Sequence, residues 1–309
     1  MARQRRPNLP THQQAPGRRC HRQPNTQAHT MQQAHDFLDT CNALHQLLGG
    51  VQAQGWGQPT QFKQWTIDDI IGHLHLWNLG ADLALRAPQA FDAQVQAYRQ
   101  ALANGESRQA FTRRWLGGVQ GPALHGVWHQ FYPQLAAHFA AADPKQRVAW
   151  LGPSMSARSS ISARLMETWA HAQAIYDLLG VEREATDAIR HIAQLGVNTR
   201  GWTFSNRGLP VPAPAPQVRL QAPSGALWLW DGTTPVDPAA NAVASEADTA
   251  AESVTGTALA FCQVVTQVRH VDDTSLVVQG AGAQAWMQWA QCFAGAPNDP
   301  PAPGTRYRQ

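Results

Sequence analysis

The amino-acid sequence predicts an α+β protein in which an antiparallel bundle of helices precedes a small α/β domain. Three observations carry this prediction. Up to about residue 200, apolar residues recur at intervals of three and four, the spacing of a helix that buries one face. Alternating prolines then fill 209–216, where they forbid helix and favour an extended spacer. Beyond them, short strand-like segments alternate with helices.

Residues 1–30 differ from the rest in composition, because they contain six Arg and no acidic residue. They lack the apolar stretch of a secretory signal, so we expect a disordered tail. Their composition would suit an organelle transit peptide, but we favour an overextended start, with Met31 as the true first residue. The remainder holds 18 basic and 21 acidic residues, and this mildly acidic balance argues against a nucleic-acid partner.

Two helices are expected before residue 87. The first covers about 31–48 and ends at the glycine pair 49–50. The second covers about 67–86, because Thr66 offers an N-cap with Asp69 three residues later, and apolar residues then follow helical spacing.

Further helical segments are separated by turn signals and by one short strand-like piece, 148–151. The expected helices cover about 90–105, 121–142, 160–179 and 185–200. Helices joined in this way are typical of an antiparallel bundle.

The domain boundary is expected at the prolines, which gives a bundle over 31–208 and an α/β domain over 209–295. Residues 296–309 are expected to form a disordered tail, and the polar segment 234–253 a mobile loop. The strands expected in the second domain are 217–221, 226–230 and 275–279, and its helices are about 256–268 and 283–293.

Two absences limit the classes of protein. The four cysteines lie far apart in the sequence, which fits neither a disulfide framework nor a cysteine zinc cluster and favours a reducing cytoplasm (Cys20, Cys41, Cys262 and Cys292). No run approaches the ~20 apolar residues that a membrane-spanning helix needs, so no membrane partner is expected.

A metal-ligand pattern stands out in the helix expected over 160–179. Glu167 and His171 lie four residues apart, on one face of that helix. His73, in the apolar helix 67–86, could supply a third ligand, although helical spacing does not distinguish it from His75. Other histidines are also available (His45, His125, His129 and His138). Three protein ligands would leave one zinc position open, which is the catalytic pattern.

Several residues could support such a site, and each has an ordinary structural explanation. Arg164, one turn before Glu167, could hold that carboxylate or form a structural ion pair. Arg269 and His270 could be catalytic, or could cap a helix C-terminus. The other candidates are an acid that could orient a ligand and two aromatic residues near the proposed ligands (Asp82, Trp77 and Trp169).

Segments 65–74 and 164–173 carry a family resemblance, Trp-Thr-Ile-Asp-Asp-Ile-Ile-Gly-His-Leu in the first and Arg-Leu-Met-Glu-Thr-Trp-Ala-His-Ala-Gln in the second. They resemble the two signature regions of the mycothiol-dependent maleylpyruvate isomerase N-terminal domain family, within the DinB-like superfamily. The chain is most similar to an uncharacterised bacterial subgroup described only as metal-binding. Further similarity lies in 150–156, 191–197 and 254–262.

The resemblance implies a DinB-like four-helix bundle followed by a small α/β domain. It implies a divalent metal, usually zinc, held by His73, Glu167 and His171. It also implies a low-molecular-weight thiol cofactor, which adds to the substrate and permits cis/trans isomerisation.

We therefore expect a cytoplasmic metalloenzyme, a thiol-dependent isomerase or transferase that acts on a small organic substrate as a monomer or homodimer. The alternative is a non-enzymatic metal-binding or ligand-sensing protein. A loose C-terminal likeness to a wyosine-synthesis domain suggests tRNA modification, which the lack of a basic surface and of an iron–sulfur cysteine motif disfavours.

Overall fold

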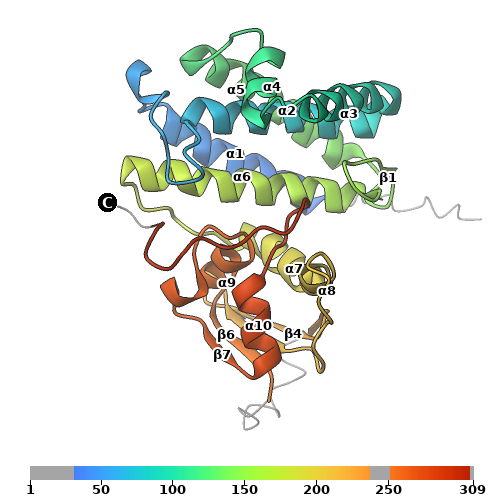
Figure 1. The fold of residues 1–309 in the computed structure, drawn as a ribbon, viewed down its shortest axis with the longest axis vertical. Coiled ribbons are helices and arrows are strands. Elements are labelled where there is room, and N and C mark those ends of the chain that lie inside the picture. The colour runs from blue at the N-terminus through green and yellow to red at the C-terminus, as the bar shows by residue number, and fades with distance from the viewer. Residues whose placement is uncertain (1–30, 237–250, 307–309) are drawn as a thin grey trace, which may run out of the picture. The chain divides into compact units, whose positions relative to one another are not determined.

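Four long helices form the bundle that the sequence predicts: α1 (Gln32–Leu48), α2 (Ile67–Arg86), α5 (Gly121–Ala141) and α6 (Ala157–Leu179). The computed structural model describes residues 31–236 and 251–306 (Figure 1). Helix α1 packs against α5 and α6, and α2 also packs against both. The disorder expected for 1–30 lies outside the described residues.

The start of α2 is fixed by a capping box. The Thr66 hydroxyl accepts a hydrogen bond from the Asp69 backbone N–H, and the Asp69 carboxylate accepts one from the Thr66 N–H, both at 3.1 Å. Asp69 also accepts from Arg113 of α4 (Arg108–Trp115) at 2.7 Å, and Asp68 accepts from the Gly121 N–H at 2.6 Å. These contacts tie the first turn of α2 to α4 and α5.

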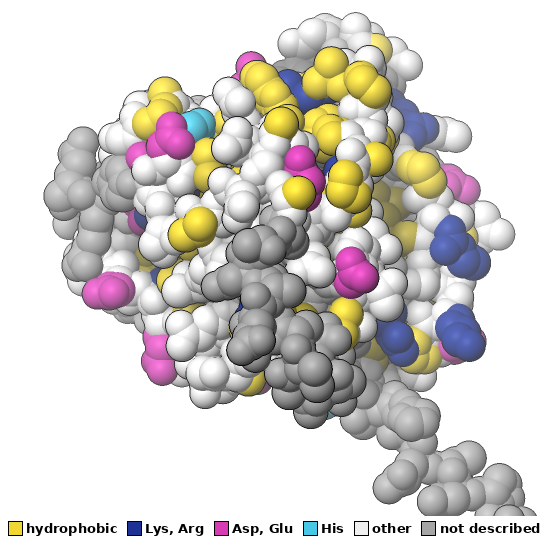
Figure 2. All heavy atoms as spheres, turned by 90° about the horizontal axis from the view of Figure 1, so that it is seen from below, with side chains coloured by type: hydrophobic (Ala, Val, Ile, Leu, Met, Phe, Trp, Pro, Cys, Tyr) yellow, Lys and Arg dark blue, Asp and Glu magenta, His cyan; other side chains and the backbone are white. Residues whose placement is uncertain are grey.

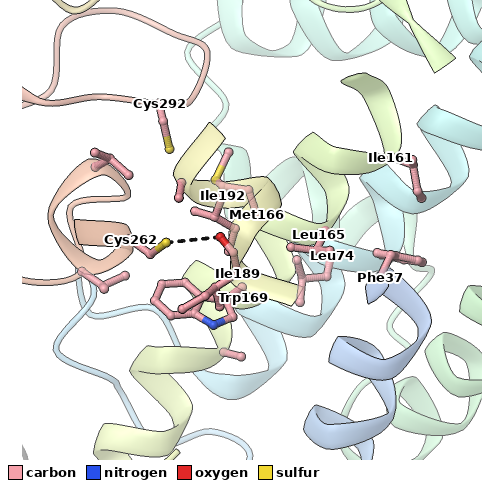
Figure 3. Packing of buried hydrophobic residues seen from close by; sticks show 14 of the residues in the cluster. Phe37, Leu74, Ile161, Leu165, Met166, Trp169, Ile189, Ile192, Cys262 and Cys292 are labelled. Carbon is pink, nitrogen blue, oxygen red and sulfur yellow. Dashed lines mark hydrogen bonds between the residues drawn. The ribbon is translucent and has the colours of Figure 1, made fainter. Parts of the chain in front are cut away.

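Helix α6 is buried on two opposite faces. Figure 3 shows Leu165 pointing toward Leu74 of α2, and Met166 pointing toward the residues that follow the bundle, including Ile192. These contacts bury α6 on both sides, although the helix also carries charged residues such as Arg164 and Glu167. Ser156 is the N-cap, so the helix begins at Ala157, three residues before the expected start. Gly180 ends the helix in the left-handed conformation at φ 64°.

Shorter elements surround the bundle. Helices α3 (Pro88–Ala103) and α4 enclose a second, smaller apolar cluster beside α2. Strands β1 (Arg147–Val148) and β2 (Met155–Ser156) pair as a short hairpin before α6. Helix α4 was not expected, because eight residues with several charges give little helical periodicity.

The expected helix 185–200 is divided in the structure. It consists of the 3-10 helix η2 (Asp187–Ile189), α7 (Arg190–Asn198) and α8 (Arg200–Ser205). Helix α7 packs against both α6 and α9 (Ala258–Val265).

The second part of the chain contains a five-stranded sheet in the order β5-β4-β3-β6-β7. Strands β3 and β6 are parallel, whereas the other neighbours are antiparallel. The strands are β3 (Gln217–Gln221), β4 (Leu227–Asp231), β5 (Thr234–Val236), β6 (Ser253–Thr257) and β7 (Val277–Gln279). Helices α9 and α10 (Ala281–Trp289) complete this part (Figure 1).

Two expectations about this part were wrong. The segment near Gly256, expected to begin a helix, is strand β6, and α9 begins only after its N-cap Thr257. Pairing with β3 and β7 on either side overrides the local helical pattern. The segment expected as a loop, 234–253, contains β5 and the first residue of β6, while 237–250 lie outside the described residues.

The bundle and the sheet part are joined by polar contacts as well as by packing. Arg269 makes a buried bidentate ion pair with Asp177 of α6, with N–O distances of 2.7 and 2.8 Å. The Cys262 thiol donates to the Ile189 carbonyl at 3.4 Å (Figure 3). Residues 31–309 form one compact unit, and the division after residue 208 stays a prediction.

The residues after Gly295, expected to be disordered, are held by hydrogen bonds up to residue 306. The Asn298 side chain donates to Gln267, and its carbonyl accepts from the same glutamine. Lys63, in the loop before α2, donates to Asn298 at 2.9 Å, and Arg207 pairs with Asp299. These long-range contacts order a segment whose composition alone suggests disorder.

The surface and the helix lengths bear on possible partners. Over the face seen in Figure 2, a few Lys and Arg side chains lie toward one side, and acidic side chains are scattered. No helix within 31–236 or 251–306 is long and apolar enough to span a membrane. The absence of a nucleic-acid partner stays a prediction.

The close approach of α7 to α9 gives a stability test. A Cβ on Gly196 would lie 2.8–3.0 Å from the side chain of buried Val265, which is stiff at χ1. We expect Gly196→Ala to lower the free energy of unfolding by about 1–2 kcal/mol, measured by urea denaturation. The control is Gly126→Ala in α5, where a Cβ meets nothing within 4 Å and should be neutral or stabilising. Equal effects of the two substitutions would contradict the steric explanation.

His75 gives a pH test. Its ring is buried beside Trp115 and Phe131, and burial lowers its pKa from 6.5 to about 4. Between these two pKa values, His75 is protonated in the unfolded chain and neutral in the folded chain. The free energy of unfolding should therefore fall as the pH drops from 6.5 toward 4, by up to about 3 kcal/mol. His75→Leu should flatten that pH dependence in urea denaturation. If the free energy of unfolding depends on pH in the same way in the parent and in His75→Leu, His75 is not the source of the pH dependence.

Candidate metal site

Helices α2 and α6 bring together the three residues singled out as metal ligands. His73 Nε2 lies 3.3 Å from Glu167 Oε2, and His171 Nε2 lies 3.2 Å from the same oxygen. One ligand atom from each residue falls within 4.8 Å of the others. The packing of α2 on α6 therefore selects His73, and His75 lies in the aromatic cluster described above.

The three side chains are partly buried. Their exposed fractions are 16% for His73, 25% for Glu167 and 12% for His171. Part of each side chain is therefore in contact with solvent, while most of it is shielded from water. Such shielding strengthens every electrostatic interaction at the site.

The environment sets the protonation states of two of these residues. Burial lowers the pKa of His73 to about 4, against the opposing effect of its hydrogen bond to Glu167. Burial alone would raise the pKa of Glu167, but hydrogen bonds from His171 and His73 and their charges hold that pKa well below 4.5. At neutral pH the site therefore offers an ionised carboxylate and a neutral His73 imidazole, the forms that bind a metal.

Two aromatic rings hold the imidazoles in place. The Trp65 ring stacks parallel to His171 at 5.7 Å between centroids, and meets His73 edge-on at 5.4 Å. Phe62 meets His171 edge-on at 4.9 Å. Sequence analysis did not assign either residue to the site. The sequence position of Trp65 could have indicated its role. Trp65 directly precedes the α2 N-cap, where an apolar residue commonly packs against the first turns of the helix.

Basic side chains gather beside Phe62. The Lys63 Nζ lies 5.6 Å from the centre of the Phe62 ring, and the Arg306 guanidinium carbon lies 5.2 Å from it. Burial lowers the pKa of Lys63, and the charges of Arg108 and Arg306 lower it further. This concentration of positive charge favours an anion near His171. Sequence patterns could not reveal it, because Arg306 lies in the segment expected to be disordered.

Arg164 lies one turn before Glu167 and is 2% exposed. Its Nε donates to Asn78 Oδ1 at 3.1 Å, while its Nη2 has no hydrogen-bond partner. Burial lowers the pKa of Arg164, and the negative charge of Glu167 opposes that effect. Arg164 therefore acts on Glu167 through its charge and holds α2 through Asn78.

The structure places Asp82 in a different cluster. Its carboxylate lies 2.7 Å from His138 Nδ1 and 3.4 Å from Arg86. Asp82 is nine residues after His73 on α2, or about 13 Å along the helix axis. Its contacts stabilise the packing of α2 against α5.

The two candidate tryptophans also pack elsewhere. Trp77 belongs to the smaller apolar cluster, where it meets Trp150 edge-on at 5.6 Å. Trp169 lies beside Ile189 and Cys262 (Figure 3). The Arg183 guanidinium lies 4.8 Å from its ring centre. Both are packing residues in the described structure.

Arg269 and His270 lie at the end of the segment that follows α9. Arg269 is engaged by Asp177 of α6, six residues beyond His171 and about 9 Å along the axis. His270 caps the 3-10 helix η4 (Val271–Asp273), where its Nδ1 accepts from the Asp272 N–H. His270 therefore caps the N-terminus of a 3-10 helix, not the helix C-terminus that was expected, and Arg269 serves as a buried link between the bundle and the sheet part.

Known proteins resemble this chain over most of its length. The family model described as the mycothiol maleylpyruvate isomerase N-terminal domain matches residues 37–176, which include all three site residues. Two proteins named as uncharacterized, from two strains of Mycobacterium tuberculosis, are each 37% identical over 262 residues, covering 85% of this chain and 95% of the relative.

Two solved structures are similar to this chain at low sequence identity. Crystal structures of the mycothiol-dependent maleylpyruvate isomerase and of a point mutant match with TM-scores of 0.45 and 0.44, at 13% and 15% identity. Each match covers 75% of this chain and 87% of the other. The family model and the two close relatives confirm the resemblance carried by the two motifs: the chain belongs to the mycothiol maleylpyruvate isomerase N-terminal domain family.

Proposed function

We propose that this protein binds a divalent metal, zinc being the best match, and acts as a thiol-dependent isomerase or transferase on a small organic substrate. The observation that carries the proposal is the convergence of His73, Glu167 and His171 within 4.8 Å. Family membership supports it, because the family is named for the N-terminal domain of a mycothiol maleylpyruvate isomerase.

The donor atoms fit zinc in kind and in spacing. Two imidazoles and one carboxylate are common zinc ligands, with bonds of about 2.0 Å. Two ligands of a tetrahedral zinc ion with such bonds lie about 3.3 Å apart. The separations of Glu167 Oε2 from His73 Nε2 and His171 Nε2, 3.3 and 3.2 Å, already have this value. Three protein ligands leave a position for substrate, thiol or water.

A bound metal with an open position would favour the thiolate form of a coordinated thiol or polarise a carbonyl group. The residues of the chain would do the rest. Trp65 and Phe62 shield the imidazoles from water on one side. Lys63 and Arg306 would attract an anionic substrate or thiolate to the same side.

The cysteines that the structure describes are poorly suited to supply the thiolate. Within the described residues, all the cysteines are buried (Cys41, Cys262 and Cys292). Burial raises the pKa of each thiol, and the nearby charge of Glu167 raises that of Cys292 further. Such thiols remain protonated at neutral pH and are poor nucleophiles. A low-molecular-weight thiol, abundant in the cytoplasm where we place the protein, would supply the thiolate.

Metal content gives the first test of this function. We expect His171→Ala to hold one equivalent of divalent metal per chain less than the purified parent protein, without unfolding, because two ligands hold zinc far more weakly than three. Elemental analysis and circular dichroism measure the two properties. The control is His138→Ala, since His138 pairs with Asp82 outside the site and its removal should leave the metal in place. Full metal retention in His171→Ala would refute the proposed site, and loss of the fold would favour a structural metal.

Thiol-dependent turnover gives the second test. The metal-loaded protein is assayed with mycothiol, bacillithiol or glutathione against a panel of cis-unsaturated and electrophilic acids, with products identified by mass spectrometry. We expect activity with at least one thiol, and a fall of roughly 100-fold or more in Glu167→Gln, which removes the ligand charge. His138→Ala again serves as the control. Turnover that Glu167→Gln leaves unchanged would mean that the reaction occurs elsewhere, and metal binding without any thiol-dependent reaction would favour the non-enzymatic alternative.

A further inference from the structure

A second group of imidazoles lies where α1 meets α5. His45 Nδ1 of α1 is 2.7 Å from His125 Nε2 of α5. The His129 ring, one turn after His125, stacks on the His45 ring with 3.7 Å between centroids and an interplanar angle of 5°. None of these residues belongs to the site between α2 and α6.

The contact between His45 and His125 constrains what lies between the two nitrogens. At 2.7 Å they must share a proton or a cation, because two facing lone pairs would repel each other. Burial and the charge of His129 lower the pKa of His45. Burial and the charges of His45 and His129 lower the pKa of His125. The pair is therefore neutral at pH 7 and has ring nitrogens available as ligands.

We propose that His45, His125 and His129 form a second metal site, for a divalent transition metal of the imidazole-binding class, Cu²⁺, Ni²⁺ or Zn²⁺. His125 and His129 are related by four residues on one helix, so they share a face. His45 reaches them from the adjacent helix. A donor set of imidazoles alone suits these metals and does not suit Mg²⁺ or Ca²⁺.

One side chain has to turn to complete this site. Across 31–236 and 251–306, only the trio of His73, Glu167 and His171 already has one ligand atom per residue within 4.8 Å. His129 is exposed, so its ring is free to rotate out of its stack on His45. The remaining pair is already close, and a cation in place of the shared proton needs only a small separation of the two rings.

The base of the cluster is rigid. Buried Trp56 and Trp128 lie beneath His125, with ring centroids 5.7 and 6.3 Å from it. They restrict the His125 ring, and preorganised ligands bind a metal more tightly. They also give a local readout, because a bound Cu²⁺ or Ni²⁺ ion quenches the fluorescence of nearby indoles.

The experiment titrates the full chain with NiCl₂ by calorimetry and tryptophan fluorescence. The His171→Ala variant is used as the background, because it removes the first site and makes the result independent of the proposed function. In that background we expect a Ni²⁺ site with fluorescence quenching. His125→Gln and His45→Gln should each weaken it roughly tenfold or more.

The matched control is His35→Gln, which removes an exposed histidine from α1 and should leave the Ni²⁺ affinity unchanged. The histidines of residues 1–30 are present in every variant, so the differences report only the substituted side chains. Circular dichroism checks the fold, and His129→Gln replaces any variant that unfolds. Equal Ni²⁺ binding in the background, His125→Gln and His45→Gln, or no binding in the background, would overturn the proposal and leave the cluster as a packing contact.

Discussion

The carboxylate of Glu167 is the group around which the bundle is arranged. Three-quarters of its side chain is shielded from water, and an unpaired charge in that position would cost several kcal/mol. His73 from α2 and His171 from α6 offset that cost by meeting the same Glu167 oxygen, and these contacts favour the register that aligns all three. Arg164, buried one turn earlier, adds an attractive charge. The same contacts that position the site therefore also fix how α2 lies on α6.

That register depends on where α2 begins. The capping box at Thr66 defines the first turn, and His73 follows two turns later. The buried carboxylate of Asp69 also pairs with the exposed guanidinium of Arg113, and this contact links the start of α2 to α4. Because Trp65 directly precedes the cap, the same anchoring places its ring against both imidazoles. A local hydrogen-bond motif and a long-range ion pair thus determine the geometry of a site formed by residues 94 positions apart.

The long helices and the Glu167–His171 pair were predictable, because both depend on periodicity within one element. Periodicity did not distinguish His73 from His75, since the two lie at opposite edges of the same apolar face. In the sequence, only the family resemblance indicated His73. Strand β6 was missed because its conformation is stabilised by β3, more than 30 residues earlier in the chain. The ordered segment near Asn298 depends on single contacts to distant residues such as Lys63, which leave no pattern in the sequence.

The ordered segment 296–306 brings residues from the C-terminal part of the chain close to the candidate metal site. It crosses from α10 to the loop before α2, where Asn298 binds Lys63 and Arg306 lies against Phe62, a neighbour of His171. The positive charge beside the site therefore comes from both parts of the chain. Since a thiolate and a carboxylate substrate are both anions, the arrangement would concentrate either one where a metal could bind it. A bundle without its C-terminal part would keep three possible ligands but lose part of the positive charge beside them, which gives a physical reason for the two parts to be held together.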